Sequence, residues 1–487
     1  MQITEEFVAS LLKRIDRLET RLRHVEKSRA QLIREKRRLR QDNALLKEKT
    51  RELTARLNSD STNSSKPPSS DKPWSERRIQ KPSGRPSGAQ PGHVGKTRPT
   101  FPPEQVDHRV SVVRRNCGKC GHRLGENHTT GQVRRHQVVE IPPVVAEVTE
   151  YALHESTCPG CGHSATADLP DGVPNSCAGV RFQAILSLLT GRCRITRREA
   201  REVAAELFGP KALVSLGTIG MLERRTSNAL RPAYDEALDA IQSADFVNCD
   251  ETSWRQSNKL AWLWAAVTPM LKVFRIDRRR NREAFRKLLL SFDGILGSDR
   301  FSVYRAHAIM KRQLCWAHLL RNFLGLEERG GTARSLGMGG QKIVKAVFKE
   351  WHRFREGELT RNGLRRRLAP IRLRLKHLLQ RHINNSVPAA RKIAKDLREY
   401  GAALWTFARV EGVEPTNNAA ERAVRKAVLW RKTSFGSASR WGSRFVERML
   451  TVCESLRAQS RSILEFLESS IRARLTNSAS PSLMPAR

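Results

Sequence analysis

The hydrophobic residues of the first 57 positions recur every seventh residue. One heptad position, d, holds Leu11, Leu18, Val25, Leu32, Leu39, Leu46 and Leu53. A strict repeat of this kind, with leucine at d and the polar Asn43 at an a position, favours a parallel two-stranded coiled coil. Facing g and e positions would carry opposite charges in four pairs: Arg14–Glu19, Arg21–Glu26, Glu35–Arg40 and Asp42–Lys47. The pattern predicts a leucine-zipper coiled coil over residues 1–57 that joins chains into a homodimer or higher oligomer, although these charges could simply solvate a helix.

The periodicity stops after residue 57. Residues 58–105 are rich in proline, glycine, serine and basic residues, as in NSDSTNSSKPPSSDKP. A segment of this composition lacks the apolar side chains that a core needs. We therefore expect 58–105 to be a disordered basic linker, whose cations could also follow a DNA backbone.

Two CxxC turns follow within residues 106–170. The sequences CGKCGH and CPGCGH place Cys117 and Cys120 in the first turn and Cys158 and Cys161 in the second. Zinc prefers four tetrahedral thiolate or imidazole ligands, which two such turns supply. The apolar and polar residues of 132–156 alternate as in strands, so the pattern predicts a zinc ribbon with a structural Zn²⁺ bound by these four cysteines.

The next segment, 171–243, has helical periodicity. REAREVAAELFG and SLGTIGMLERRTSNAL are separated by a short break, and Ser215 can cap the second helix. Two helices in this arrangement resemble a DNA-binding helix-turn-helix. Two helices packed into a core explain the pattern equally well.

From residue 244 the pattern changes to strands that end in acids. FVNCDE reaches Asp250, residues 260–268 and 272–277 form an expected strand pair, 282–292 an expected helix, and Asp299 closes another short apolar run. This is the order of a ribonuclease-H-like core, in which the strands carrying Asp250 and Asp299 lie side by side.

A third acid comes from the mostly helical remainder of the chain. Glu421 follows Asn417 and Asn418, which can cap a helix, and so falls in the first turns of that helix. Glu447 and Glu454 lie on one face of a later helix, which a solvated surface would explain. Carboxylates at 250, 299 and 421 can together hold two Mg²⁺ or Mn²⁺ ions, and two such ions cleave phosphodiesters. The fold class predicted is thus a multidomain α+β chain.

The net charge of the chain indicates which class of molecule the protein binds. The 487 residues carry 89 Lys and Arg against 49 Asp and Glu, a formal net charge of +40. Such a balance indicates a polyanionic partner, and nucleic acid is the first choice. The charged N-terminus lacks the apolar core of a signal peptide, and no apolar run is long enough to span a bilayer. We therefore expect a cytoplasmic, nucleoid-associated protein with no membrane partner.

The ordered motifs resemble the transposases of the insertion sequence 66 family. They run from about residue 60 to 470: NSSKPPSSD, GAQPGHVGKT, the two CxxC turns, CDET, GSDRFSVY, QLCWAHLLRNF, NNAAERAVR and RKTSFGS. The resemblance implies a DDE-type transposase whose ribonuclease-H-like core, 244–470, is interrupted by a helical insertion at about 320–410. It implies the triad Asp250, Asp299 and Glu421. His318 in the CxxH stretch, with Arg321, Arg422 and Arg425, would support the site or contact DNA.

The function implied is binding of insertion-sequence ends, DNA cleavage and joining of the 3′-hydroxyl ends to target DNA. Its partners would be the terminal repeats, target DNA and helper proteins of the same element. Two alternatives stay open: a DNA-binding regulator without catalysis, and an endonuclease of the same fold that does not join strands. Residues 471–487 are expected to form a disordered tail.

Overall fold

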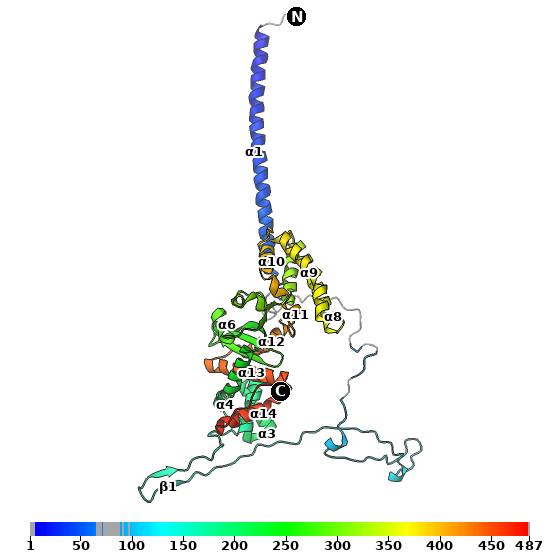
Figure 1. Cartoon of the computed structure of the whole chain (residues 1–487), viewed down its shortest axis with the longest axis vertical. Coiled ribbons are helices and arrows are strands. Elements are labelled where there is room, and N and C mark those ends of the chain that lie inside the picture. The colour runs from blue at the N-terminus through cyan, green and yellow to red at the C-terminus, as the bar shows by residue number, and fades with distance from the viewer. Residues whose placement is uncertain (1–4, 65–70, 72–87, 90–91, 96–97, 486–487) are drawn as a thin grey trace. The chain divides into compact units, whose positions relative to one another are not determined.

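The computed structural model describes residues 5–64, 71, 88–89, 92–95 and 98–485 (Figure 1). The chain divides into two compact units. Unit 1 comprises Met1–Lys72, Glu150–Glu202 and Val214–Arg487, and unit 2 comprises Pro73–Thr149 and Val203–Leu213. The expected linker at 58–105 lies in large part outside the described residues.

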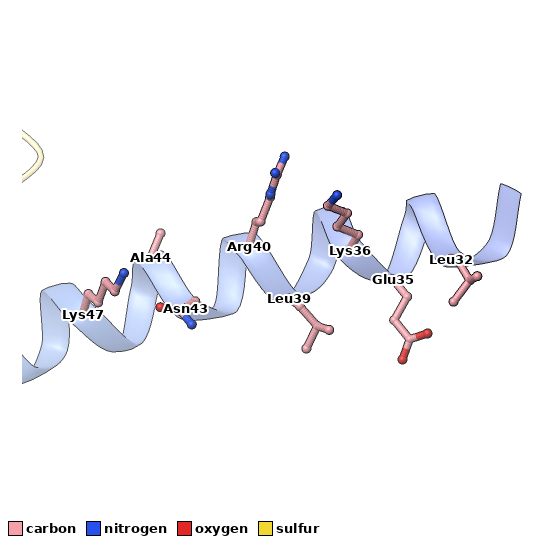
Figure 2. A pocket seen from close by; sticks show the side chains of 8 residues that line it. All are labelled: Leu32, Glu35, Lys36, Leu39, Arg40, Asn43, Ala44 and Lys47. Carbon is pink, nitrogen blue, oxygen red and sulfur yellow. The ribbon is translucent and has the colours of Figure 1, made fainter. Parts of the chain in front are cut away.

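Helix α1, Glu5–Leu57, is a single uninterrupted helix of 53 residues. Its heptad leucines are exposed, from 43% at Leu11 to 65% at Leu32. Figure 2 shows one stretch of this seam, where Leu32 and Leu39 project to the same side of the helix. The helix is therefore as predicted, and its apolar seam is uncovered within the single chain.

The segment between the CxxC turns departs from the prediction. In unit 2 the described elements before Thr149 are the short 3₁₀ helices η2, Pro103–Gln105, and η3, Glu126–His128. Residues 132–149 form no strand, and Val133, Val138 and Ile141 are exposed. The prediction of strands in this segment is therefore wrong. Alternating residues give a segment one apolar and one polar side, but a strand also needs a neighbouring strand as its hydrogen-bonding partner. In unit 1, β1, Glu155–Thr157, and β2, Ser164–Thr166, form an antiparallel hairpin around the second CxxC turn.

Residues 180–242 are helical, as predicted. The elements are α2 (Val180–Ser187), the π-helical η4 (Leu188–Cys193), α3 (Arg197–Phe208), η5 (Pro210–Ala212), α4 (Leu216–Ala229) and α5 (Arg231–Gln242). Ser215 caps α4, since its side chain accepts a hydrogen bond from the Thr218 amide. Helix α4 packs against α2 and against two helices from the far end of the chain, α13 (Arg440–Ala458) and α14 (Ile463–Leu475). This packing supports the interpretation of α4 as a core helix, and a helix-turn-helix role stays a prediction.

A five-stranded mixed sheet forms the centre of unit 1. Its strands are β3 (Phe246–Gln256), β4 (Lys259–Val267), β5 (Lys272–Asp277), β6 (Ile295–Ser298) and β7 (Arg312–Leu314). The spatial order is β5-β4-β3-β6-β7, with the first three antiparallel and the last two parallel to β3. Ser257 and Asn258 both have positive φ, as a two-residue type I′ turn between β3 and β4 requires. Helix α6, Arg282–Leu288, lies in the crossover from β5 to β6.

Side chains of α13 satisfy the free edge of β5. Glu447, Thr451 and Ser455 are spaced one helical turn apart and accept hydrogen bonds from the amides of Ile276, Phe274 and Lys272, at 2.6, 3.1 and 2.9 Å. Amides on an edge strand point outward at every second residue, and this repeat matches the rise of one helical turn. Glu447 and Glu454 are 1% and 4% exposed. The prediction that a solvated face explains both acids is therefore wrong.

A helical segment with its own core separates β7 from the last part of the fold. It contains α7 (Trp316–Arg329), α8 (Ala333–Arg355), α9 (Arg361–His382), α10 (Pro388–Glu399), η8 (Gly401–Leu404) and α11 (Thr406–Arg409). Its buried side chains form a hydrophobic cluster distinct from the one around the sheet. Helices α8 and α9, yellow in Figure 1, lie side by side.

The chain then returns to the sheet with α12, Asn418–Ser434, which packs on β3 and β4. Beyond α14, the backbone continues to residue 485 in an ordered course. Leu483 is fully buried and its amide donates to Glu236 Oε2 at 2.7 Å. The disordered tail expected at 471–487 is therefore wrong for 471–485, because residues 471–475 complete α14 and apolar Leu483 reaches the core. Among the described helices, none has the length and hydrophobicity needed to cross a membrane.

Candidate active site and zinc-binding segment

Asp250 lies in β3 and Asp299 directly follows β6, at the same level of these neighbouring parallel strands. Asn248 of β3 pairs with Gly297 of β6, and each aspartate follows two residues later. Asp250 sits inside β3 rather than at its end, because β3 continues to Gln256 through its pairing with β4. The predicted strand end is thus wrong, but the predicted juxtaposition of the two strands is right. No residue of β6 pairs with Asp250, because β6 ends one position before that level.

Glu421 reaches this region from the first turn of α12. Asn417 occupies the N-cap position of this helix, but its side-chain amide donates to the Cys249 carbonyl of β3 at 3.3 Å instead of capping the helix. The alanines Ala420, Ala423 and Ala427 are buried on the face of α12 that meets the sheet. Small side chains let the helix approach closely, which holds the Glu421 backbone beside β3.

The three acids influence one another electrostatically. The pKa of the Asp250 carboxyl lies well above its ordinary range, first because burial disfavours its charge and then because Glu251, Asp299 and Glu421 repel it. Clustered carboxylates in a partly buried place are stabilised when cations neutralise them. Oxygen donors are those that Mg²⁺ and Mn²⁺ prefer. The residues present therefore fit a hard divalent metal.

In the described chain the three carboxylates do not close into one tight ligand cluster. The group of metal-ligating side chains whose donor atoms all lie within 4.8 Å is Cys315, His318 and Glu421. Glu421 Oε1 instead lies 3.0 Å from Arg321 Nη2 and 3.3 Å from His318 Nδ1. Glu421 must rotate away from Arg321 to share a cation with both aspartates.

Cys315 and His318 come from the start of α7 and support this corner of the site. Cys315 Sγ accepts a hydrogen bond from the Asn417 amide at 3.4 Å, and burial raises the pKa of its thiol to about 12. Burial, and then Arg321, lower the pKa of His318, which keeps the ring neutral. His318 Nδ1 is buried without hydrogen-bond geometry to any described partner, although Glu421 Oε1 is close. Of the four predicted supporting residues, His318 and Arg321 thus meet Glu421, while Arg422 and Arg425 are exposed on α12.

Glu251, the neighbour of Asp250, is held by its own partners. Its side chain is 3% exposed, and Oε1 accepts from Arg280 Nη2 at 2.6 Å and Nε at 3.0 Å. Tyr304 donates its hydroxyl to Oε2. Burial raises the pKa of Glu251, followed by Asp299, while Arg280 opposes the increase. Successive strand residues face opposite sides of a sheet, so Asp250 and Glu251 point to opposite sides and cannot both face the same candidate metal site.

Sequence reasoning missed a clamp on the turn that follows Asp299. Arg300 donates to Asp396 Oδ2 on α10 at 3.1 Å and to Asn322 on α7 at 2.9 Å. Arg305 donates to the other oxygen of Asp396 at 3.1 Å. Asp396 thus ties the turn after a candidate metal ligand to the helical segment. The RKIAKDLREY pattern gave no such signal, because Asp396 has the spacing of a surface residue.

The raised pKa of Asp250 predicts an unusual stability change. In Mg²⁺-free buffer, Asp250→Asn should raise the melting temperature by roughly a few degrees at about pH 8, because it removes a poorly compensated buried charge. The unfolded Asp releases its proton at lower pH than the folded one. The charge therefore lowers stability increasingly as pH rises from about 4 to the folded pKa, and the full cost remains above it.

Thermal melts from about pH 4 to pH 8 check this expectation, and the gain from the substitution should vanish toward about pH 4. Asp293→Asn is the matched control, because Asp293 is exposed and its Lys311 partner lowers its pKa. Equal gains from both variants, or a gain independent of pH, would contradict the assignment.

The two CxxC turns have the same local geometry. In unit 2, the Cys117 amide donates to the His122 carbonyl at 2.8 Å and Gly121 donates back to Cys117 at 3.0 Å. In unit 1, Cys158 donates to His163 and Gly162 to Cys158, both at 2.8 Å. Gly121 and Gly162 have φ of 73° and 74°, a conformation that favours glycine. Backbone amides, first those of Cys120 and Gly160, lower the pKa of the Cys117 and Cys158 thiols. Lowered thiol pKa values favour metal binding.

Three segments of the chain match known protein families. The family described as "Transposase IS66 family" matches residues 203–444. The "zinc-finger binding domain of transposase IS66" matches residues 114–162, and a family of unknown function (DUF6444) matches residues 18–99.

Two curated proteins of Sinorhizobium fredii are similar to the chain. Uncharacterized protein y4jD is 26% identical over 363 residues, which cover 66% of this chain and 67% of that protein. Uncharacterized protein y4qI is 24% identical over 275 residues, which cover 50% of each. The chain thus spans about two thirds of one relative and half of the other.

Proposed function

Since the chain belongs to the IS66 family of transposases and carries the zinc-finger domain of that family, we propose that it is a DDE-type enzyme acting on the ends of an insertion sequence. It cleaves the DNA there and joins the 3′-hydroxyl ends to target DNA. The observation that carries this proposal is the placement of Asp250 in β3 and of Asp299 just after the parallel strand β6, at one level of the sheet, with Glu421 on a helix packed against the same sheet.

The sheet supports a ribonuclease-H-like core. Numbered within the core, its strands run in the order 3-2-1-4-5, with the second strand antiparallel to both of its neighbours. The acids stand on strand 1, after strand 4 and on a helix that follows the insertion. This order of strands and acids supports the ribonuclease-H-like core proposed from residue 244 onward.

Asp250, Asp299 and Glu421 would hold two Mg²⁺ or Mn²⁺ ions. When bound, such ions activate the attacking oxygen and stabilise the leaving oxygen of a phosphodiester. The protein's own part is positioning. Rigid β3 and β6 fix the two aspartates, and the turn after Asp299 is held by Asp396 through Arg300. Arg321, once Glu421 leaves it, is a cation beside the site that can face a DNA phosphate. Neutral His318 limits the positions open to Glu421 without repelling a cation.

We assign the zinc to Cys117, Cys120, Cys158 and Cys161. Two turns of matching geometry, lowered thiol pKa values and the family match support this assignment. Four thiolates complete a tetrahedral shell, so the ion is structural and leaves no position open for catalysis. Its expected contribution is to hold the zinc finger in the form that binds the terminal repeats.

The exposed seam of α1 supports a coiled-coil dimer. Each heptad leucine left in water forgoes about 1.5–3 kcal/mol of burial, and the a and d residues of α1 are exposed over its whole length. Asn43, Arg40 and Lys47 line the same surface hollow of α1 as Leu39, and Figure 2 labels all four. A second copy in parallel would cover the leucines and pair Arg40 and Lys47 with Glu35 and Asp42 of the partner helix.

Asn43→Leu should tighten this association and relax its orientation or stoichiometry, because a buried asparagine specifies parallel dimers at a cost in stability. Sedimentation equilibrium of the full chain measures the affinity and the stoichiometry. Gln41→Leu is the control, since it adds the same side chain outside the seam. A wild-type peptide of residues 1–57 that remains monomeric at high concentration would refute the dimer.

The function itself is tested by incubating the protein with Mg²⁺ and linear DNA that bears the native element ends. Mapping of the products should show cuts at the ends and 3′ ends joined to target DNA. Binding without cleavage would indicate a regulator, and cleavage without joining would indicate an endonuclease of the same fold.

A further inference from the structure

Helix α9 presents a row of unpaired cations. Between Arg361 and His382 it contains no Asp or Glu. Its apolar face is buried in the helical segment through leucines and one isoleucine spaced three or four residues apart: Leu364, Leu368, Ile371, Leu375, Leu378 and Leu379. The rest of the helix surface exposes seven cations, with Arg365, Arg372 and Lys376 along one side: Arg365, Arg366, Arg367, Arg372, Arg374, Lys376 and Arg381. We call these seven residues the α9 patch.

The cations of this patch have no internal use. Within the described chain, none of the seven makes an ion pair or a side-chain hydrogen bond. On α8, Glu350 neutralises Arg353, and Asp396 of α10 binds two arginines from the turn after β6. Lysines of α8 are also exposed, but α9 is the helix of this segment on which the unpaired cations are mostly arginines. Arg361, at the start of α9, is also committed, because it donates to the Phe407 and Val410 carbonyls at the end of α11. The patch is therefore a charged surface that the fold leaves unsatisfied.

An open hollow adjoins the patch between α9 and α11. It is lined by arginines 365, 366 and 372 of α9 and by Arg409 of α11, around the small side chains Ala369 and Ala408. No acidic residue lines it. A hollow surrounded by four guanidinium groups is suited to phosphate oxygens, which arginine binds in a bidentate manner.

We propose that the α9 patch binds the phosphate backbone of double-stranded DNA. This inference rests on the proposed function and extends it, since none of these residues belongs to the metal site or to the zinc finger. From residue 365 to 381 the helix rises about 24 Å, which spans roughly seven phosphates of one strand. The contacts are to phosphates, so the patch adds affinity without reading sequence.

The test is a full-length variant, Arg365→Gln/Arg366→Gln/Arg372→Gln. Glutamine keeps much of the side-chain length and the helix propensity. Binding to a random-sequence duplex is measured by fluorescence anisotropy in Mg²⁺-free buffer over a range of KCl concentrations. The slope of log K against log[KCl] should become shallower by about 2 to 3, since each phosphate contact contributes about 0.9. Affinity near physiological salt should fall by at least about tenfold.

The control is Lys342→Gln/Lys345→Gln/Lys349→Gln, which removes three exposed charges from α8 in the same helical segment. An equal loss in both variants would show that only net charge matters and would overturn the proposal. So would an unchanged slope in the α9 variant, or a loss confined to an RNA duplex used as a second probe. Failure of the proposed function would appear separately. If the wild type could not cleave element ends in Mg²⁺, the salt slopes of the wild type and the α9 variant would still differ.

Discussion

Glu421→Gln is expected to abolish both DNA cleavage and strand joining while leaving DNA binding nearly intact. Glutamine has the same shape but lacks the charge needed to hold a divalent cation with Asp250 and Asp299. Losing this proposed metal ligand should cost several kcal/mol of transition-state stabilisation, or at least about 1000-fold in rate. Binding rests on basic residues and should persist. Product mapping in Mg²⁺ and anisotropy on the element ends measure the two properties side by side, and Asp250→Asn and Asp299→Asn should behave alike.

Glu447→Gln is the matched control, because Glu447 is a buried acid with a structural role. Its carboxylate accepts from the Ile276 amide and from Arg444. The substitution should lower the melting temperature while leaving the activity of the folded fraction near wild type. If Glu421→Gln retained strand transfer while folded Glu447→Gln or Glu454→Gln had none, the third ligand would be misassigned.

Cys158→Ser is expected to lower the bound zinc from about one ion per chain to near zero, since structural sites need all four ligands. Binding to the element ends should weaken with it. The melting of the sheet and its helices should change little, because their two hydrophobic cores contain none of the four cysteines. Metal analysis of freshly purified, reduced protein gives the zinc content, and calorimetry separates the transitions.

Cys177→Ser controls for loss of a thiol, since Cys177 is also an exposed free cysteine but lies outside the two turns. It should leave zinc content and end binding unchanged. Wild-type protein without zinc, or Cys158→Ser protein with a full complement, would rule out the four-cysteine site.

The candidate site combines one part that sequence could locate and one that it could not. The order of strands and acids around Asp250 and Asp299 follows from local periodicity, because parallel neighbours in this topology bring equivalent positions together. The present orientation of Glu421 does not follow, since Arg321 and His318 lie 100 and 103 positions earlier in the chain. They meet Glu421 only because the start of α7 lies beside the start of α12. Asp396 could not be identified from the sequence for the same reason, because its arginine partners lie far from it along the chain.

Sequence alone determined the elements whose signal is local. The heptads of α1 define one long helix, the two CxxC turns share a glycine with positive φ, and short apolar runs define β4 and β5. Tertiary structure alone decided which polar residues are buried and what they serve. Glu447 and Glu454 have the spacing of a solvated face, yet the free amides of β5 bring Glu447 into the interior. Likewise, residues 132–149 alternate like strands but lack a partner, and Leu483 is buried although its surroundings read as a tail. Periodicity reports only which side of an element is apolar, whereas burial and hydrogen bonding depend on neighbours supplied by distant parts of the chain.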